Sequence, residues 1–309
     1  MNRNGDRFRR IPLQALCAVA WLAAGGASLA ATPMAELSLP PLAQPATGEH
    51  HLGKIIWVDL VTPDLASAKQ FYAGLFGWTF QAVPGGRDYV VALADGQPVG
   101  GLLQRAIPPG KQQQPLWLTF LATSDVAAVQ RNVLAHGGKL LSGPRDYPQR
   151  GRQAVFSDPD GAVFAVLASS SGDPSDFLAA PGEWIWSSLL VRNPDQEAMF
   201  YKTVFGYDVV DLPSEDSAKH VILSSDDFAR AGLNSFPGDA RRRHPHWLNF
   251  VRVESADAAS AKAVALGGRV LVEPRIDRHG GKLAVVADPS GAPVGLMEWS
   301  DTDTQQAPQ

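Results

Sequence analysis

An internal repeat constrains this chain more than any other feature. The segment GKIIWVDLVTPDLASAKQFYAGLFGW, which begins at Gly53, aligns without a gap with GEWIWSSLLVRNPDQEAMFYKTVFGY, which begins at Gly182. A Trp-Leu-x-Phe segment follows each copy, at 117–120 and 247–250, and an Asp-Pro-x-Gly-Ala turn comes later, at 158–162 and 288–292. Equal spacing over about a hundred residues predicts a duplicated domain, so both halves should share one fold.

The pattern within each repeat predicts strands and helices in a regular order. Residues 55–61 alternate between two faces, as in a strand. Asp64 can cap a helix with apolar residues at helical spacing, and Gly77 can end it. Short strands are expected near 78–83, 88–94 and 98–104, and the pattern restarts at 115 with a second strand and helix followed by three strands. Each repeat is therefore predicted to be an α+β domain of two βαβββ units.

The repeats also set the domain boundaries. We predict a signal peptide at 1–30, a Pro/Ala-rich flexible spacer at 31–52 and a first domain at 53–169. A linker at 170–182 leads to a second domain at 183–300, and the polar tail at 301–309 is expected to be disordered. Because the linker is short, the two domains should pack on each other.

The N-terminal segment has the three parts of an export signal. Four arginines lie within 3–10, an apolar run covers 11–24, and small residues at 28–30 suit a signal peptidase. We expect cleavage before Ala31 and a periplasmic or secreted protein. An uncleaved membrane anchor is the alternative, although Gln14 and two glycines interrupt a run that barely reaches bilayer-spanning length. Arg9-Arg10 leaves the choice between Sec and twin-arginine export open.

Cysteine content and charge exclude several classes of function. Cys17 is the only cysteine and lies in the leader, so the mature chain would have no disulfide, thiolate metal site or cysteine nucleophile. The precursor has 27 basic and 31 acidic residues. Removing the leader takes away four arginines and Asp6, which leaves 23 basic and 30 acidic residues and a formal net charge of −7. This balance argues against nucleic acid or an anionic membrane as a partner.

The combined motifs resemble a known superfamily. The pattern D-L-x-x-x-x-x-F-Y-x-x-L-F-G-W from Asp64, the W-L-x-F strand, the Gly-Gly helix end and the D-P-D-G-A turn are similar to the vicinal oxygen chelate superfamily. That group contains glyoxalases, extradiol dioxygenases and bleomycin-resistance-type binding proteins. The match extends over nearly all of 53–300 and is most similar to the tandem-domain branch. The resemblance implies paired βαβββ modules, each pair curled around a cleft.

The resemblance also implies where a metal would bind in the superfamily's enzymes. Their ligands are a His on the first strand, a His on the strand that opens the second module and a Glu on the last strand. The corresponding positions here are Trp57, Trp117 and Ala165 in the first repeat and Trp186, Trp247 and Gly295 in the second. An indole has an N–H donor and no lone pair for a metal. We therefore predict no metal and no cofactor, and we assign no catalytic residue.

Seven residues are candidates for contact with a small-molecule ligand: Trp57, Asp59, Tyr89, Trp117, Trp186, His220 and Trp247. Two interpretations of the four tryptophans stay open, since they either line a cleft or fill the interior of each sheet. Asp59 is either a base or cation partner, or an anchor of local hydrogen bonds. His220 aligns with Tyr89 on a middle strand, whereas His244 and His246 are expected in a solvated loop.

Three functional hypotheses follow. The first is an exported, metal-free protein that binds a small, aromatic molecule. The second is a lyase, isomerase or dioxygenase that uses unusual residues such as Asp59, Tyr89 and His220. The third is an interaction or scaffold protein with filled clefts. The sequence favours the first hypothesis because the fold of the superfamily is retained while the residues of its metal site are not, and it leans away from an enzyme.

Overall fold

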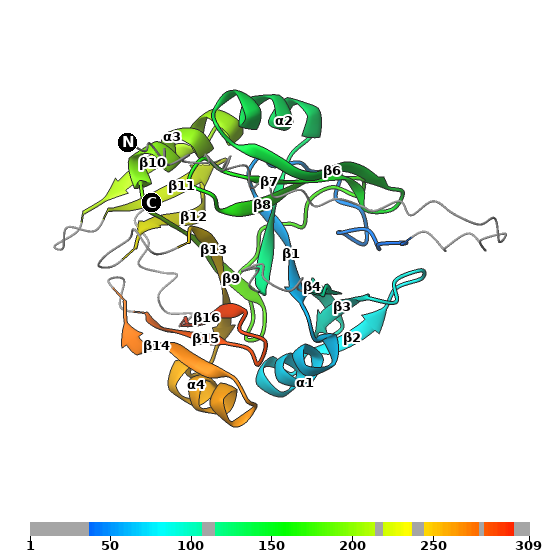
Figure 1. The fold of residues 1–309 in the computed structure, drawn as a ribbon, viewed down its shortest axis with the longest axis vertical. Coiled ribbons are helices and arrows are strands. Elements are labelled where there is room, and N and C mark those ends of the chain that lie inside the picture. Colours follow the sequence, from blue (N-terminus) through cyan, green and yellow to red (C-terminus); the bar gives the residue numbers. More distant parts are fainter. Residues whose placement is uncertain (1–36, 107–114, 214–218, 237–243, 278–280, 300–309) are drawn as a thin grey trace, which may run out of the picture. The chain divides into compact units, whose positions relative to one another are not determined.

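The computed structural model describes residues 37–106, 115–213, 219–236, 244–277 and 281–299. Over these residues each repeat forms one open, eight-stranded sheet with two helices (Figure 1). The predicted leader and the tail at 301–309 lie outside the described residues. No helix within the described part of the chain is long and apolar enough to cross a membrane.

The elements of the two repeats follow the same order. The first repeat contains β1 (Ile55–Thr62), α1 (Leu65–Phe76), β2 (Thr79–Ala82), β3 (Tyr89–Ala94), β4 (Gln97–Gln104), β5 (Leu116–Ala122), α2 (Val126–Ala135), β6 (Lys139–Tyr147), β7 (Gly151–Ser157) and β8 (Val163–Ser169). The second contains β9 (Trp184–Val191), α3 (Pro194–Phe205), β10 (Asp208–Leu212), β11 (His220–Ser225), β12 (Phe228–Ser235), β13 (His246–Val253), α4 (Ala256–Ala265), β14 (Arg269–Ile276), β15 (Lys282–Ala287) and β16 (Pro293–Glu298).

Strand order confirms the two βαβββ units in each repeat. The first sheet runs β2-β3-β4-β1-β5-β8-β7-β6, and the second runs β10-β11-β12-β9-β13-β16-β15-β14. The first strands of the two units, β1 and β5, pair antiparallel at the centre of the sheet. Each of them also pairs in parallel with the last strand of its own unit. The predicted α+β fold of two tandem domains is therefore confirmed.

The ends of the first helix of each repeat depend on the residues that the sequence indicated. A side-chain oxygen of Asp64 accepts a hydrogen bond from the first turn of α1, and Asn193 does the same for α3. Gly77 and Gly206 follow the helices with φ of 78° and 71°, a left-handed conformation that favours glycine. These caps explain why α1 and α3 have matching lengths.

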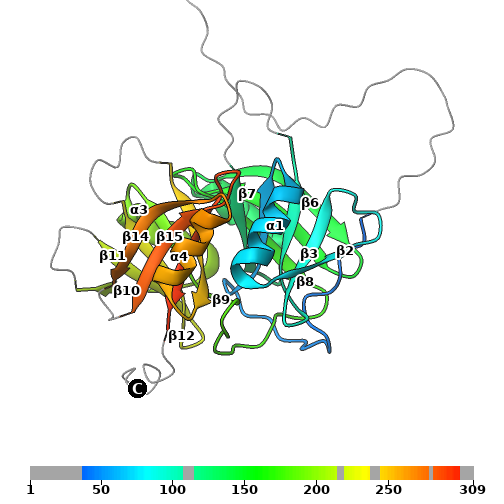
Figure 2. The ribbon, with the colours of Figure 1, turned by 90° about the horizontal axis from the view of Figure 1, so that it is seen from below.

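Two apolar cores join the repeats, and each is formed by one βαβββ unit of the first repeat and one of the second. One core contains residues of α2, β7 and β8 from the first repeat together with residues of α3, β11 and β12 from the second. The other core combines α1, β3 and β4 with α4, β15 and β16. Figure 1 and Figure 2 both show α1 beside α4. Packing between the two domains, which the sequence predicted, is therefore part of the main hydrophobic core.

Two contacts show how the repeats meet. Thr119 and Asn249 are counterparts in the repeat, and their side chains hydrogen-bond to each other, with Asn249 Nδ2 at 3.0 Å from Thr119 Oγ1. Trp78 is 1 % exposed and packs against Trp117 and Trp184, while its indole N–H donates to the carbonyl of Gly182 at 2.7 Å. Both contacts are buried, so they fix the register of one repeat against the other.

The described part of the expected spacer corrects the prediction of a flexible segment. Residues 37–43 cross the first sheet, and Leu39 and Leu42 are buried in a cluster with strand residues. Ser38 N donates to the carbonyl of Pro84 at 3.1 Å, and Leu42 N donates to Ser171 Oγ at 3.1 Å. Apolar side chains hidden among the Pro and Ala residues explain why this segment packs.

Candidate functional site

Each sheet has one face that does not contact the interdomain cores, and we call these the first and second concave faces. On the first, Trp57, Phe120 and Ala165 lie in one row across β1, β5 and β8. Residues of β3 and of β8, from opposite halves of the sheet, belong to the same packed cluster as this row. On the second, the matching row is Trp186, Phe250 and Gly295.

A buried hydrogen-bonded cluster occupies the first concave face. Asp59 Oδ1 accepts from Trp57 Nε1 at 2.8 Å and from Tyr89 Oη at 2.8 Å. A Cβ atom at Gly101 would overlap Tyr89 and Asp59, so glycine is required on β4 for the cluster to form. Burial raises the pKa of Asp59, and the bonds from Tyr89 and Trp57 partly offset this. Asp59 thus anchors local hydrogen bonds.

Arg150 completes this cluster, and sequence reasoning missed it. Its guanidinium lies 4.2 Å from the centre of the Trp57 ring, in a cation–π contact. The residue is 1 % exposed, and none of its three side-chain nitrogens has a hydrogen-bond partner among the described residues. Several arginines occupy the β6–β7 hairpin, and no sequence signal distinguishes the one that turns inward.

The first concave face is closed by the chain itself. Residues 37–43 lie against Trp57, Tyr89 and Val91, and Leu39 and Leu42 are buried there. In Figure 1 this dark blue segment lies between strands β6–β8 and strands β2–β4. The first face therefore offers little open surface to a ligand.

The second concave face keeps the same layout with different side chains. Ser188 replaces Asp59, His220 replaces Tyr89, and Gly232 corresponds to Gly101. An ideal Cβ atom at Gly232 would lie 3.2 Å from Asn234 Nδ2, 3.3 Å from Ser188 Oγ and 3.4 Å from Trp186 Nε1. Polar groups from two strands, β9 and β12, therefore converge on the space that glycine leaves open.

One further contact and two indole N–H groups without a described acceptor complete this polar group. His220 Nδ1 lies 2.6 Å from Asn234 Oδ1, so the histidine holds the amide oxygen and directs the amide nitrogen toward Gly232. No described residue accepts a hydrogen bond from the indole N–H of Trp186. The indole N–H of Trp299, which packs in the same cluster, is buried without a partner among the described residues. The second face therefore carries hydrogen-bond donors that a ligand can use.

The two faces differ most in exposure. Trp57 and Tyr89 are 8 % and 4 % exposed, whereas Trp186 and His220 at the matching positions are half-buried. Leu248, Phe250 and Met297 form an apolar floor beside Trp186. A half-buried aromatic ring next to convergent polar groups is typical of a small-molecule site.

Trp117 and Trp247 do not share a face with the other two tryptophans, which corrects the sequence-based placement. Trp117 is paired with Leu60, three residues beyond Trp57, and an odd separation places a side chain on the other face of a strand. Its indole N–H donates to Tyr72 Oη at 3.0 Å, and that of Trp247 donates to Tyr201 Oη at 3.2 Å. For this pair the core interpretation holds.

The same alternation brings an unexpected histidine onto the second face. His246 begins β13, two residues before Leu248, so it lies on the Trp186 side and not in a solvated loop. Its ring packs 6.0 Å from that of Phe236. Asn234 and Trp299 were also missed by sequence reasoning. Strand alternation from Trp186 could have indicated His246 and Asn234, whereas nothing in the sequence indicated Trp299.

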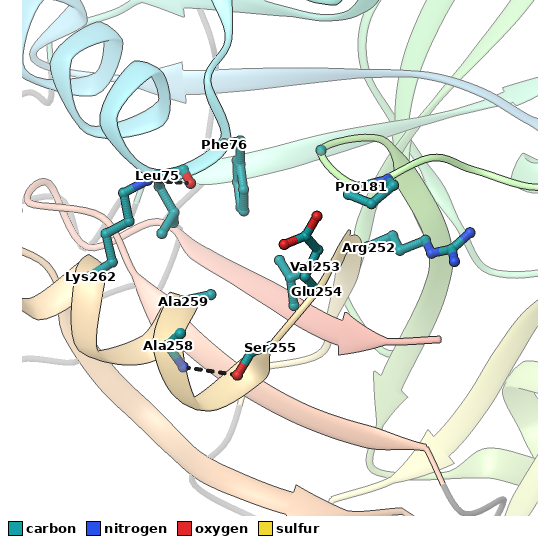
Figure 3. Close-up of a pocket in the computed structure, with 11 residues that line it drawn as sticks. Leu75, Phe76, Pro181, Arg252, Val253, Glu254, Ser255, Ala258, Ala259 and Lys262 are labelled. Atoms are coloured by element: carbon teal, nitrogen blue, oxygen red, sulfur yellow. Dashed lines mark hydrogen bonds between the residues drawn. The ribbon is translucent and has the colours of Figure 1, made fainter. Parts of the chain in front are cut away.

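A separate surface pocket lies outside both concave faces (Figure 3). It has a volume of about 280 Å³ and lies where α1, the linker and the start of α4 meet. Most of its polar groups are already engaged: Lys262 Nζ bonds the Leu75 carbonyl, Arg252 bonds the carbonyls of Ala179 and Trp299, and Ser255 caps α4. This pocket therefore offers fewer free donors than the second concave face.

Comparison with known proteins identifies the family. Residues 54–166 match the model of the Glyoxalase/Bleomycin resistance protein/Dioxygenase superfamily, and residues 187–297 match that of the glyoxalase-like domain. CFP32 of Mycobacterium tuberculosis is 32% identical over 259 residues, which is 82% of this chain and 98% of CFP32. The chain belongs to this superfamily.

Other proteins similar to this chain have names that describe different activities. The anthracycline biosynthesis protein DauV of Streptomyces sp. strain C5 is 32% identical over 262 residues, covering 80% of this chain and 93% of DauV. Among solved structures, the Mn(II)-bound glyoxalase of Novosphingobium aromaticivorans superposes with a TM-score of 0.55 at 20% identity. The match covers 81% of this chain and 83% of the glyoxalase. At this identity the likeness concerns the fold.

The residues present do not fit the divalent metal of the superfamily's enzymes. The rows Trp57–Phe120–Ala165 and Trp186–Phe250–Gly295 contain no side chain with a lone pair suited to a metal. A Cβ at Gly295 would overlap the Phe250 ring, so an aromatic side chain covers the last position. Among the described residues, no group of three or more His, Cys, Asp or Glu is placed to hold a metal ion.

Proposed function

We propose that this protein binds a small, planar aromatic molecule on its second concave face, without a metal ion. One observation carries the proposal: the indole N–H of half-buried Trp186 converges on Gly232 together with the side-chain polar groups of Ser188 and Asn234. The ring offers a stacking surface, and the indole and amide N–H groups offer donors to oxygen substituents. A ligand with an aromatic plane and carbonyl or hydroxyl groups along one edge matches both features.

The names of relatives support the same chemical class. DauV is named for anthracycline biosynthesis, and anthracyclines contain a planar aromatic ring system with oxygen substituents. The proposal includes export, since the N-terminal segment has the parts of a signal peptide. It also treats the first concave face as closed, because residues 37–43 cover it.

Calorimetric titration with a dihydroxyanthraquinone tests the proposal. Trp186→Ala should weaken binding by about tenfold or more, since losing a ring contact and its buried area removes about 1.4 kcal/mol or more. Gly232→Ala should also weaken binding, because the added methyl group enters the polar centre at 3.2–3.4 Å from three side-chain atoms. Both variants should unfold at nearly the temperature of the unmodified protein.

Phe177→Ala is the matched control. Phe177 is 67 % exposed on the linker, so it tests whether the probe adheres to any accessible aromatic ring. Its variant should bind like the unmodified protein. Equal affinity in the Trp186→Ala and unmodified proteins, or no binding at all, would refute a ligand site on the second concave face.

A further inference from the structure

The guanidinium of Arg150 is a buried charged group outside the ligand site proposed on the second concave face. Arg150 lies in the turn between β6 and β7, where its N–H donates to the Tyr147 carbonyl at 3.0 Å and its carbonyl accepts from Ser170 N at 3.2 Å. These bonds hold the backbone, so the inward direction of the side chain is built into the turn. At 1 % exposure the side chain is enclosed in the first concave face.

No described side chain meets the hydrogen-bonding needs of this group. A guanidinium has five N–H donors and no acceptor, and it stays charged in proteins. Nε, Nη1 and Nη2 of Arg150 are all buried without an acceptor. Asp59 contributes an attractive charge, but its Oδ1 already accepts from Trp57 and Tyr89, and no ion pair with Arg150 forms among the described residues.

Such an arrangement is costly unless something else supplies oxygen atoms. A buried charge is tolerated when it is paired and hydrogen-bonded, and an enclosed one without acceptors strongly destabilises the fold. The guanidinium carbon lies 4.2 Å from the centre of the Trp57 ring, which supplies no oxygen to the N–H edges. These edges have the planar fork geometry that binds the two oxygens of a carboxylate.

We propose that Arg150 binds a small, singly charged oxyanion, such as a carboxylate, enclosed within the first concave face. The charge follows from Asp59, which accepts a hydrogen bond from the same Trp57 ring that the guanidinium contacts, because a nearby carboxylate disfavours a doubly charged anion more strongly than a singly charged one. The site should therefore prefer acetate to hydrogen phosphate. It is separate from the ligand site proposed on the second face, and neither depends on the other.

Residues 37–43 control access to this site. Leu39 and Leu42 cover the cluster, and Ser171 Oγ accepts from both Leu42 N and Ala43 N at 3.1 Å. An anion can enter only when this segment lifts. Ser171→Ala removes the acceptor of two bonds, so it should speed acetate association while Arg150 and its neighbours stay in place.

Thermal unfolding of the full chain with added acetate tests the site, in a buffer free of carboxylate, phosphate and sulfate. Acetate should raise the midpoint of the unmodified protein by several degrees with saturation, and hydrogen phosphate should do so less. Arg152→Met is the matched control, because Arg152 belongs to the same hairpin and pairs with Asp146 in solvent. Its variant should respond to acetate, whereas Arg150→Met should not.

The variants also separate this proposal from a purely structural role. Without acetate, Arg150→Met should unfold at the same or a higher temperature, because it removes a buried charge that lacks acceptors. No response of the unmodified protein to acetate, or an equal response in Arg150→Met, overturns the proposal. If Arg150→Met does not fold, crystals of the unmodified protein soaked in bromoacetate decide: anomalous density beside the guanidinium supports the site, and water alone overturns it.

Discussion

Glu197 gives the chain a pH dependence of stability that can be worked out from its position. The side chain is fully buried on α3, and it lies close to the carboxyl groups of Asp158 and Asp160. The repeat places Ala68 at the matching position of α1, so this acid has no counterpart in the first repeat. Burial raises the pKa of Glu197 to about 9, and the negative charge of Asp158 adds to the effect.

The sign of the effect follows from proton binding. Between about pH 4.5 and pH 9 the unfolded chain has released the proton of Glu197, whereas the folded chain retains it. Stability therefore falls as pH rises through this window, by up to about 1.4 kcal/mol per pH unit. From pH 5 to pH 7 the loss due to Glu197 amounts to about 2–3 kcal/mol.

Glu197→Gln should abolish this contribution. We expect the free energy of unfolding of the variant, relative to the unmodified protein, to rise by about 2–3 kcal/mol from pH 5 to pH 7, as measured by urea titration at each pH. Asp158, whose pKa is raised to about 6 mainly by burial, titrates in both proteins. The exposed Glu254→Gln is the control for the loss of a surface carboxyl group. A pH-independent difference for Glu197→Gln would show that the carboxyl group is ionised in the folded protein.

Three further predictions concern the interface, the metal and the leader. Trp78→Ala should lower the free energy of unfolding by about 3–5 kcal/mol in urea, since the ring is buried where the repeats meet; an unchanged value would contradict that packing. Elemental analysis of purified protein should find no stoichiometric zinc, manganese or iron, and one equivalent per repeat, with an activity lost on chelation, would overturn the metal-free proposal. Mass spectrometry of the periplasmic or secreted fraction should find a chain beginning near Ala31, and an intact leader on a cytoplasmic protein would contradict export.

The fold was predictable because its signals are local and occur twice. The caps at Asp64 and Asn193, the glycine that ends each of these two helices, and the turn at 158–162 each specify an element, and repetition separates them from chance. The face of a strand is harder to predict. Trp57 and Trp117 lie on different strands, and their faces depend on the register that pairs Trp57 with Phe120 and Leu60 with Trp117, which spacing along the chain does not show.

The least predictable part of the site depends on burial between distant segments. Buried Arg150 contacts Trp57, and residues 37–43, more than a hundred positions earlier, pack in the same cluster as Trp57. Nothing in a Pro/Ala-rich stretch indicates that Leu39 and Leu42 would be its buried residues. The difference in exposure between the equivalent residues Trp57 and Trp186 has the same origin, because residues 37–43 cover the face that carries Trp57.

The two apolar cores have a consequence for the history of the chain. Each core is formed by one βαβββ unit of the first repeat and one of the second. A chain of one repeat would therefore leave the apolar faces of both its units uncovered. Two such chains would cover these faces in each other, with Thr119 and Asn249 meeting near the symmetry axis. The present protein has the organisation of a homodimer whose subunits were fused through residues 170–182. Cutting the linker beside exposed Phe177 should therefore yield two fragments that remain associated, as a heterodimer of unequal halves.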